Sequence, residues 1–268
     1  MDKRPIGVFD SGIGGLSLLR ELDSLMPYED YIYVGDTAYM PYGTRTEQEI
    51  VNRSEQIIRF LEGKQCKMIV IACNTISGLL PEITRREKHD TPVVGIINYG
   101  CVAAALYVTY NFSIGVLATR RTVNSGVYRE VIDNFDPSVS LFAQECTDLI
   151  PHIEAGHIGS PEVRVLAEKY LRPMLKEDID TLILGCTHLP FIKNIIQDII
   201  GPSVILIDPA RRTAVLCLKT LRDNGLLKIN HKEPGKKKFF VTGKPADFKS
   251  SAQLVLGWKF PRVERIKL

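Results

Sequence analysis

Two apolar segments of strand length each end in a cysteine that small polar residues follow at once. Residues 68–72 lead into Cys73 and then Asn-Thr, and residues 182–185 lead into Cys186 and then Thr-His. A continuous apolar run of this length is typical of a buried parallel strand. Ligands of open α/β sheets bind at the carboxyl ends of such strands. The sequence therefore predicts an α/β fold with one thiol at each of two strand ends.

The rest of the chain repeats this plan. Strand-like runs alternate with helical patterns, which indicates parallel α/β sheets, and residues 113–117 resemble residues 6–9 at nearly the separation of the two cysteines. We therefore predict two similar α/β lobes with mostly parallel sheets, facing each other across a central cleft. Residues 98–209 would form the second lobe. Residues 1–97 would form the first, completed by 210–268, because the last strands have no counterpart in the second half.

Composition excludes several classes of function. The net charge of +3 is too small to indicate nucleic-acid binding, and no apolar stretch reaches the length of a membrane span. The first residues contain no apolar signal-peptide core, so we expect a cytoplasmic protein with reduced thiols. Six widely spaced cysteines without a C-x-x-C pair indicate neither a disulfide framework nor a zinc site. We expect no metal and no cofactor.

Two thiols on opposite sides of a substrate could remove a proton from one face and return one to the other. A free thiol is mostly protonated at neutral pH and needs a partner group to act as a base. His188 lies two residues after Cys186, and Asp10 ends the first strand, on the rim of the sheet where Cys73 lies. The glycine-rich residues 10–15 could offer N–H groups to a substrate carboxylate, and the hydroxyl-rich residues 119–125 could bind a second one.

At these positions the chain resembles the glutamate racemases of the cofactor-independent aspartate/glutamate racemase superfamily. The motifs are DSGIGG, PYG, ACNT, PHIEAG and LGCTH, in this order. The resemblance implies interconversion of L- and D-glutamate by proton transfer at Cα, supplying D-glutamate for peptidoglycan synthesis. It makes Cys73 and Cys186 the bases, with Asp10 assisting the first and His188 the second. Glu154 and Asp36 match further acidic residues of the site.

The resemblance also implies the substrate contacts. Besides Asp10, His188 and the two cysteines, the matching positions are Ser11, Pro41, Tyr42, Gly43, Asn74, Thr75, Thr119, Thr122 and Thr187. Glutamate is expected to be preferred over aspartate. The chain departs from the family at Leu189, where tyrosine is usual, and at residues 98–100 and 208–212; the first two departures are expected to flank the cleft.

Three alternatives stay open. One is an aspartate or broad-specificity racemase on the same scaffold. Another is a hydrolase that uses Cys186 and His188 as a nucleophile pair, although neighbours two apart on one loop seldom form such a pair with an orienting third group. The third is a non-catalytic binding protein. A homodimer is compatible with these motifs, which do not encode the oligomeric state.

Overall fold

The computed structural model describes residues 2–86, 89–228, 233–258 and 260–268. Ten strands form two fully parallel sheets within these residues. The larger sheet has six strands in the order β10-β9-β2-β1-β3-β4. Its strands are β1 (Ile6–Asp10), β2 (Tyr31–Gly35), β3 (Met68–Ile71), β4 (Val93–Gly95), β9 (Lys237–Val241) and β10 (Val263–Arg265).

The smaller sheet has four strands in the order β6-β5-β7-β8, and it repeats the order of β2-β1-β3-β4. Its strands are β5 (Ser113–Ala118), β6 (Ser140–Glu145), β7 (Thr181–Gly185) and β8 (Ile205–Ile207). In this correspondence β1 matches β5, and β3 matches β7. The predicted fold class and the internal repeat are therefore present in the topology. The lobe boundaries themselves stay a prediction.

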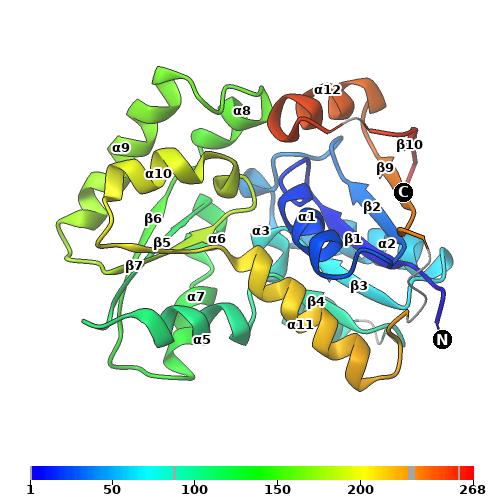
Figure 1. Cartoon of the computed structure of the whole chain (residues 1–268), viewed down its shortest axis with the longest axis horizontal. Helices are drawn as coiled ribbons and strands as arrows, with labels where there is room; N and C mark the ends of the chain where they lie inside the picture. The colour runs from blue at the N-terminus through cyan, green and yellow to red at the C-terminus, as the bar shows by residue number, and fades with distance from the viewer. Residues whose placement is uncertain (1, 87–88, 229–232, 259) are drawn as a thin grey trace.

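Helices cover both sheets, as Figure 1 shows. The longer ones are α1 (Leu16–Leu25), α2 (Glu47–Gly63), α5 (Tyr99–Val108), α9 (Pro161–Leu175), α10 (Lys193–Ile200), α11 (Pro209–Asp223) and α12 (Pro245–Leu256). Shorter ones are α3 (Asn74–Ser77), α4 (Leu80–Arg86), α6 (Arg120–Asn124), α7 (Val127–Asp133), α8 (Leu149–Glu154), η1 (Tyr42–Thr44) and η2 (Leu189–Ile192). Helix α11 packs on α1 of the larger sheet and also contacts α5 beside the smaller one. No helix among the described residues is long and apolar enough to cross a membrane.

Local sequence explains where these elements begin. Thr46 caps α2 and exchanges hydrogen bonds with Glu49, which together form a capping box. Ser160 caps α9 and Pro161 occupies its first turn. The predicted tail strand is also confirmed, because β9 pairs with β2 of the larger sheet.

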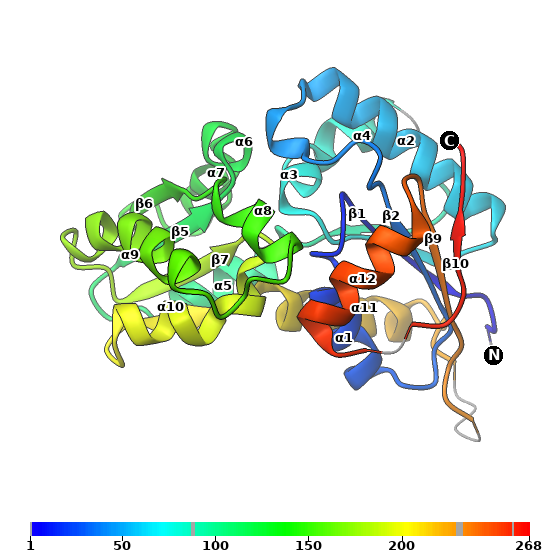
Figure 2. The same cartoon turned by 90° about the horizontal axis from the view of Figure 1, so that it is seen from above.

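The two halves meet along a seam, and one of the buried apolar clusters spans both of them. A single buried cluster contains Ile6 and Val8 of β1 together with Ile114 and Val116 of β5. Figure 2 shows α6 beside α3, and α8 beside α12, on the two sides of this seam. The carboxyl ends of β1, β3 and β7 meet here, which places the chemistry-bearing residues between the halves.

Candidate active site

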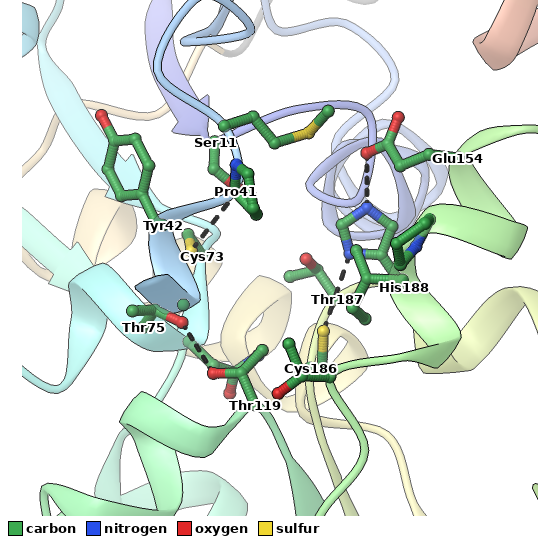
Figure 3. Close-up of a pocket in the computed structure, with 16 residues that line it drawn as sticks. Ser11, Pro41, Tyr42, Cys73, Thr75, Thr119, Glu154, Cys186, Thr187 and His188 are labelled. Atoms are coloured by element: carbon green, nitrogen blue, oxygen red, sulfur yellow. Dashed lines mark hydrogen bonds and ion pairs between the residues drawn. The ribbon is translucent and has the colours of Figure 1, made fainter. Parts of the chain in front are cut away.

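A cavity of about 300 Å³ lies between the two sheets, at the carboxyl ends of β3 and β7. This volume suits a small-molecule ligand. In Figure 3 Cys73 lies on one side of it and Cys186 on the other. The lining residues are Ser11, Met40, Pro41, Tyr42, Gly43, Cys73, Asn74, Thr75, Thr119, Thr147, Ile150, Pro151, Glu154, Cys186, Thr187 and His188.

Cys73 follows β3 and is almost completely buried. Its Sγ lies 3.9 Å from the Ser11 Oγ, the single side-chain contact drawn for it in Figure 3. Burial, reinforced by the negative charge of nearby Asp10, raises the pKa of the Cys73 thiol to about 12. In this structure Cys73 is therefore a protonated thiol at neutral pH, suited to giving a proton away.

Cys186 follows β7 and has a different environment. Its Sγ lies 3.6 Å from Nδ1 of His188, and Nε2 of His188 lies 2.6 Å from Oε1 of Glu154. Burial opposes protonation of the imidazole, but its hydrogen bonds to Cys186 and Glu154 outweigh that effect and raise the pKa of His188 well above its usual value. A protonated His188 stabilises negative charge on the adjacent sulfur. This side of the cavity is suited to taking a proton.

This geometry corrects one expectation. Residues two apart on one loop do form a thiol–imidazole pair here, because Glu154 comes from α8 to orient the ring. The arrangement alone is compatible with a nucleophilic cysteine as well as with a basic one. The feature that a hydrolase leaves unexplained is the second thiol, Cys73, in the same cavity.

Asp10 and Asp36 lie behind the cavity and do not line it. Asp10 is fully buried; one carboxylate oxygen accepts the Gly12 N–H at 3.0 Å, and the other lies 3.4 Å from the Thr187 hydroxyl. Burial raises the pKa of Asp10. It thus lies beside the Cys186 loop, and its negative charge also acts on Cys73, while its role in catalysis stays a prediction.

The carboxylate of Asp36 has its hydrogen-bonding capacity filled by other side chains. It accepts two bonds from Arg53, at 2.7 and 3.1 Å, one from Thr242 at 2.7 Å, and a short one from the Tyr42 hydroxyl. Tyr42 lines the cavity, whereas Asp36 does not. Asp36 therefore holds Tyr42 in place, which is a positioning contact rather than a contact with the reacting atoms.

Three threonine hydroxyls meet across the seam. Thr75 of α3 lies 3.1 Å from Thr119 and 3.3 Å from Thr122, and these two lie 3.0 Å apart. Thr75 and Thr119 line the cavity, while Thr122 lies behind them. Hydroxyl groups can turn to donate, so this cluster could bind a carboxylate brought between the halves.

The glycine-rich loop is used differently from our expectation. The N–H of Gly12 already donates to Asp10, and that of Ile13 lies 3.4 Å from Oε1 of Glu154. A Cβ on Gly14 would lie 2.3 Å from the Thr187 hydroxyl. These amides bind carboxylates of the protein itself, and the absence of side chains lets the loop approach the Cys186 loop closely.

Two departures from the family pattern also lie elsewhere than expected. Leu189 is fully buried in the core of the smaller sheet and Asn98 caps α5; neither lines the cavity. Four lining residues were not predicted from the sequence, namely Met40, Thr147, Ile150 and Pro151. Pro151 belongs to the PHIEAG motif, so the sequence contained a signal for it, whereas Met40, Thr147 and Ile150 lie outside the motifs. Among the described residues no group of three or more potential metal ligands gathers.

Comparison with known proteins agrees with this geometry. A family model described as "Asp/Glu/Hydantoin racemase" matches residues 6–217. The glutamate racemase of Thermoanaerobacter pseudethanolicus is 40% identical over 268 residues, covering 100% of this chain and 99% of the relative.

Solved structures give the same result. Glutamate racemase isoform RacE1 from Bacillus anthracis superposes with a TM-score of 0.93 at 32% identity, covering 100% of this chain and 99% of that one. Glutamate racemase from Francisella tularensis, solved in complex with D-glutamate, has a TM-score of 0.90 at 36% identity, covering 100% and 98%.

Proposed function

The chain belongs to the Asp/Glu/hydantoin racemase family, and we propose that it interconverts L- and D-glutamate by two-base proton transfer between Cys73, Cys186 and the substrate Cα. The family makes it an amino-acid racemase, an isomerase. The observation that carries the proposed mechanism is the presence of two buried thiols, one from each sheet, on facing sides of one small cavity.

In one direction, Cys186 as the thiolate removes the α-proton, and the Cys73 thiol gives its proton to the opposite face. After the product has left, Cys186 is a protonated thiol and Cys73 is a thiolate. The enzyme can then react with the opposite enantiomer, or proton exchange with water restores the starting state. In each turnover Cα loses one proton and gains one, and the substrate is neither oxidised nor reduced.

Neighbouring groups would set the two protonation states. His188, held by Glu154, stabilises the thiolate of Cys186, while burial and the charge of Asp10 keep the proton on Cys73. The carbanion formed at Cα needs hydrogen-bond donors and a cavity that excludes water. The buried hydroxyls around the cavity supply such donors.

Substrate binding follows from the polar lining. Glutamate carries two carboxylates, and hydroxyl donors lie at two places in the cavity: the threonine cluster at Thr75 and Thr119, and the Ser11 hydroxyl near Cys73. The Francisella relative was solved with D-glutamate. These facts favour glutamate over aspartate, because a donor placed for a longer acid stays unpaired with a shorter one.

We place the reaction in the cytoplasm, where reducing conditions would keep the thiols free, and assign its D-glutamate to peptidoglycan synthesis. All six cysteines are free thiols, which supports a reducing compartment. The peptidoglycan role rests on the family resemblance.

The decisive experiment follows the circular dichroism of L-glutamate and, separately, of D-glutamate with no cofactor added. Both signals should decay to zero, and Cys73→Ala and Cys186→Ala should each abolish the decay. Cys217→Ala removes a buried thiol outside the cavity and serves as the matched control, with turnover retained.

Three results would contradict the proposal. Full activity of folded Cys73→Ala would indicate a mechanism with a single thiol. Dependence on added pyridoxal phosphate would contradict the two-base mechanism. An equal or higher kcat/KM for aspartate would contradict glutamate as the preferred substrate.

A further inference from the structure

Asn74 follows Cys73 directly and, among the described residues that line the cavity, is the one with an unpaired buried donor. Its Nδ2 is buried and has no hydrogen-bond partner in the described part of the chain. A buried donor without a partner destabilises a protein, so a native structure that keeps one usually reserves it for a ligand or an ordered water.

The other end of the same amide is bound. The Tyr128 hydroxyl donates to Oδ1 of Asn74 over 2.9 Å. Tyr128 belongs to α7, on the opposite side of the seam from Asn74 in α3, and its side chain is buried. Tyr128 does not line the cavity, and within the described part of the chain its hydrogen bond to a lining residue is the one to Asn74.

An amide presents an acceptor at one end and a donor at the other, and turning it by 180° exchanges them. When the Tyr128 hydroxyl donates to Oδ1, the end left over is the NH₂ group. If the amide turned, the acceptor oxygen would become the unpaired end, and it would repel a carboxylate. A phenol can also accept a hydrogen bond, but a buried one needs an acceptor for its own proton. In the described part of the chain that acceptor is Oδ1 of Asn74. A turned amide would leave the phenol proton unpaired, so the Tyr128 hydroxyl favours the orientation that keeps the NH₂ group for an anion.

We infer that Tyr128 is a positioning residue for substrate binding: it fixes the Asn74 amide so that Nδ2 is kept for a carboxylate of the substrate. The inference deepens the proposed function and rests on it. It also requires α7 to be docked against α3, so the donor is available when the two halves are closed around the cavity.

Tyr128→Phe tests this by removing one hydroxyl and keeping the ring. We expect KM for glutamate to rise roughly tenfold, the usual consequence of losing one well-oriented hydrogen bond to a charged group, with kcat changed less. The matched control is Tyr31→Phe. Its hydroxyl is also buried, but it donates to the carbonyls of Leu22 and Met26 far from the cavity. Tyr31→Phe should lower the melting temperature by a similar amount and leave KM unchanged.

A double-variant cycle separates positioning from packing. Asn74→Ala alone should raise KM, and adding Tyr128→Phe to it should change KM by less than twofold, because no amide remains to be oriented. If the two single effects instead multiply, Tyr128 acts independently of Asn74 and the inference is wrong. An unchanged KM in folded Tyr128→Phe would overturn it equally.

Calorimetric titration with glutamate distinguishes this failure from failure of the proposed function. It measures affinity without depending on turnover, and enantiomers interconvert without net heat. A wild type that binds glutamate but does not racemise it contradicts the proposed function alone. A Tyr128→Phe variant that binds glutamate as tightly as an active wild type contradicts this inference alone.

Discussion

Replacing Glu154 with glutamine removes the charge that orients His188 and keeps it protonated. The side chain keeps its shape, and the contact that changes is the 2.6 Å hydrogen bond from His188 Nε2 to Oε1. A hydrogen bond to a charged group contributes about 1.5–3 kcal/mol. At 1.36 kcal/mol for each factor of ten in rate, kcat/KM should fall by roughly 10- to 150-fold.

The pH dependence of this loss has a definite sign. In the wild type the pKa of His188 is raised, so the imidazolium beside Cys186 persists above the usual histidine range. In Glu154→Gln that pKa falls, and the proton is lost at a lower pH. The variant should therefore approach the wild type near pH 6 and fall further behind as pH rises. The raised pKa of His188 also stabilises the folded state. This contribution is complete below the unfolded-state pKa of about 6.5, and it is lost as pH rises through the pKa of the folded state.

The assay is racemisation of glutamate by circular dichroism from pH 6 to 9, with the His188 titration followed by NMR. Glu145→Gln is the control, because Glu145 forms an exposed ion pair with Arg120 outside the cavity. A folded Glu154→Gln protein with kcat/KM within twofold of wild type at every pH would refute the role given to the His188–Glu154 pair.

Three further predictions concern groups behind the site. Asp36→Asn leaves Arg53 buried without its counter-charge, so the free energy of unfolding should fall by about 3–5 kcal/mol, and KM should rise because Tyr42 loses its partner. Urea denaturation measures the loss, with the exposed ion-pair variant Asp133→Asn as the control. A loss as small as that of the control would contradict the prediction. Gly14→Ala places a Cβ 2.3 Å from the Thr187 hydroxyl and 2.7 Å from the His188 ring, whereas Gly159→Ala meets nothing within 4 Å; steady-state kinetics should show a large loss of kcat for the first variant only. Burial raises the pKa of Cys217 to about 12. Above pH 9 the folded state therefore keeps this proton while the unfolded state has lost it. As pH rises, this thiol should lower the free energy of unfolding by up to about 1.4 kcal/mol per pH unit. Denaturation in reductant at pH 8 to 10 should give a shallower slope for Cys217→Ala, and equal slopes would count against it.

Features that depend on local pattern were predictable from the sequence. Residues 68–72 and 182–185 are apolar throughout, which identified the buried strands before Cys73 and Cys186. The Thr46 cap of α2 needs only side chains three residues apart. These signals lie within one strand or one helical turn, so a single sequence contains them.

Contacts between distant segments were not predictable in the same way. The Tyr128–Asn74 bond joins residues 54 apart, and nothing in either neighbourhood indicates the other. The glycines of residues 12–15 were interpreted as an anion-binding loop because their pattern permits it. Only the packing shows that Asp10 and Glu154 occupy two of the amides. Leu189 was expected to flank the cleft because it follows His188 in the sequence. The turn of η2 instead directs its side chain into the core.

Racemisation in D₂O under initial-rate conditions shows whether two different groups handle the proton on the two faces of Cα. Product and remaining substrate are separated as enantiomers and analysed for deuterium at Cα by NMR or mass spectrometry. With Cys73 and Cys186 acting from opposite faces, nearly every product molecule should carry deuterium at Cα, while the remaining substrate should carry none. The result should be the same whether the reaction starts from L- or from D-glutamate. Product that retains the original hydrogen, or substrate labelled as fast as product, would indicate a single base and contradict the two-thiol account.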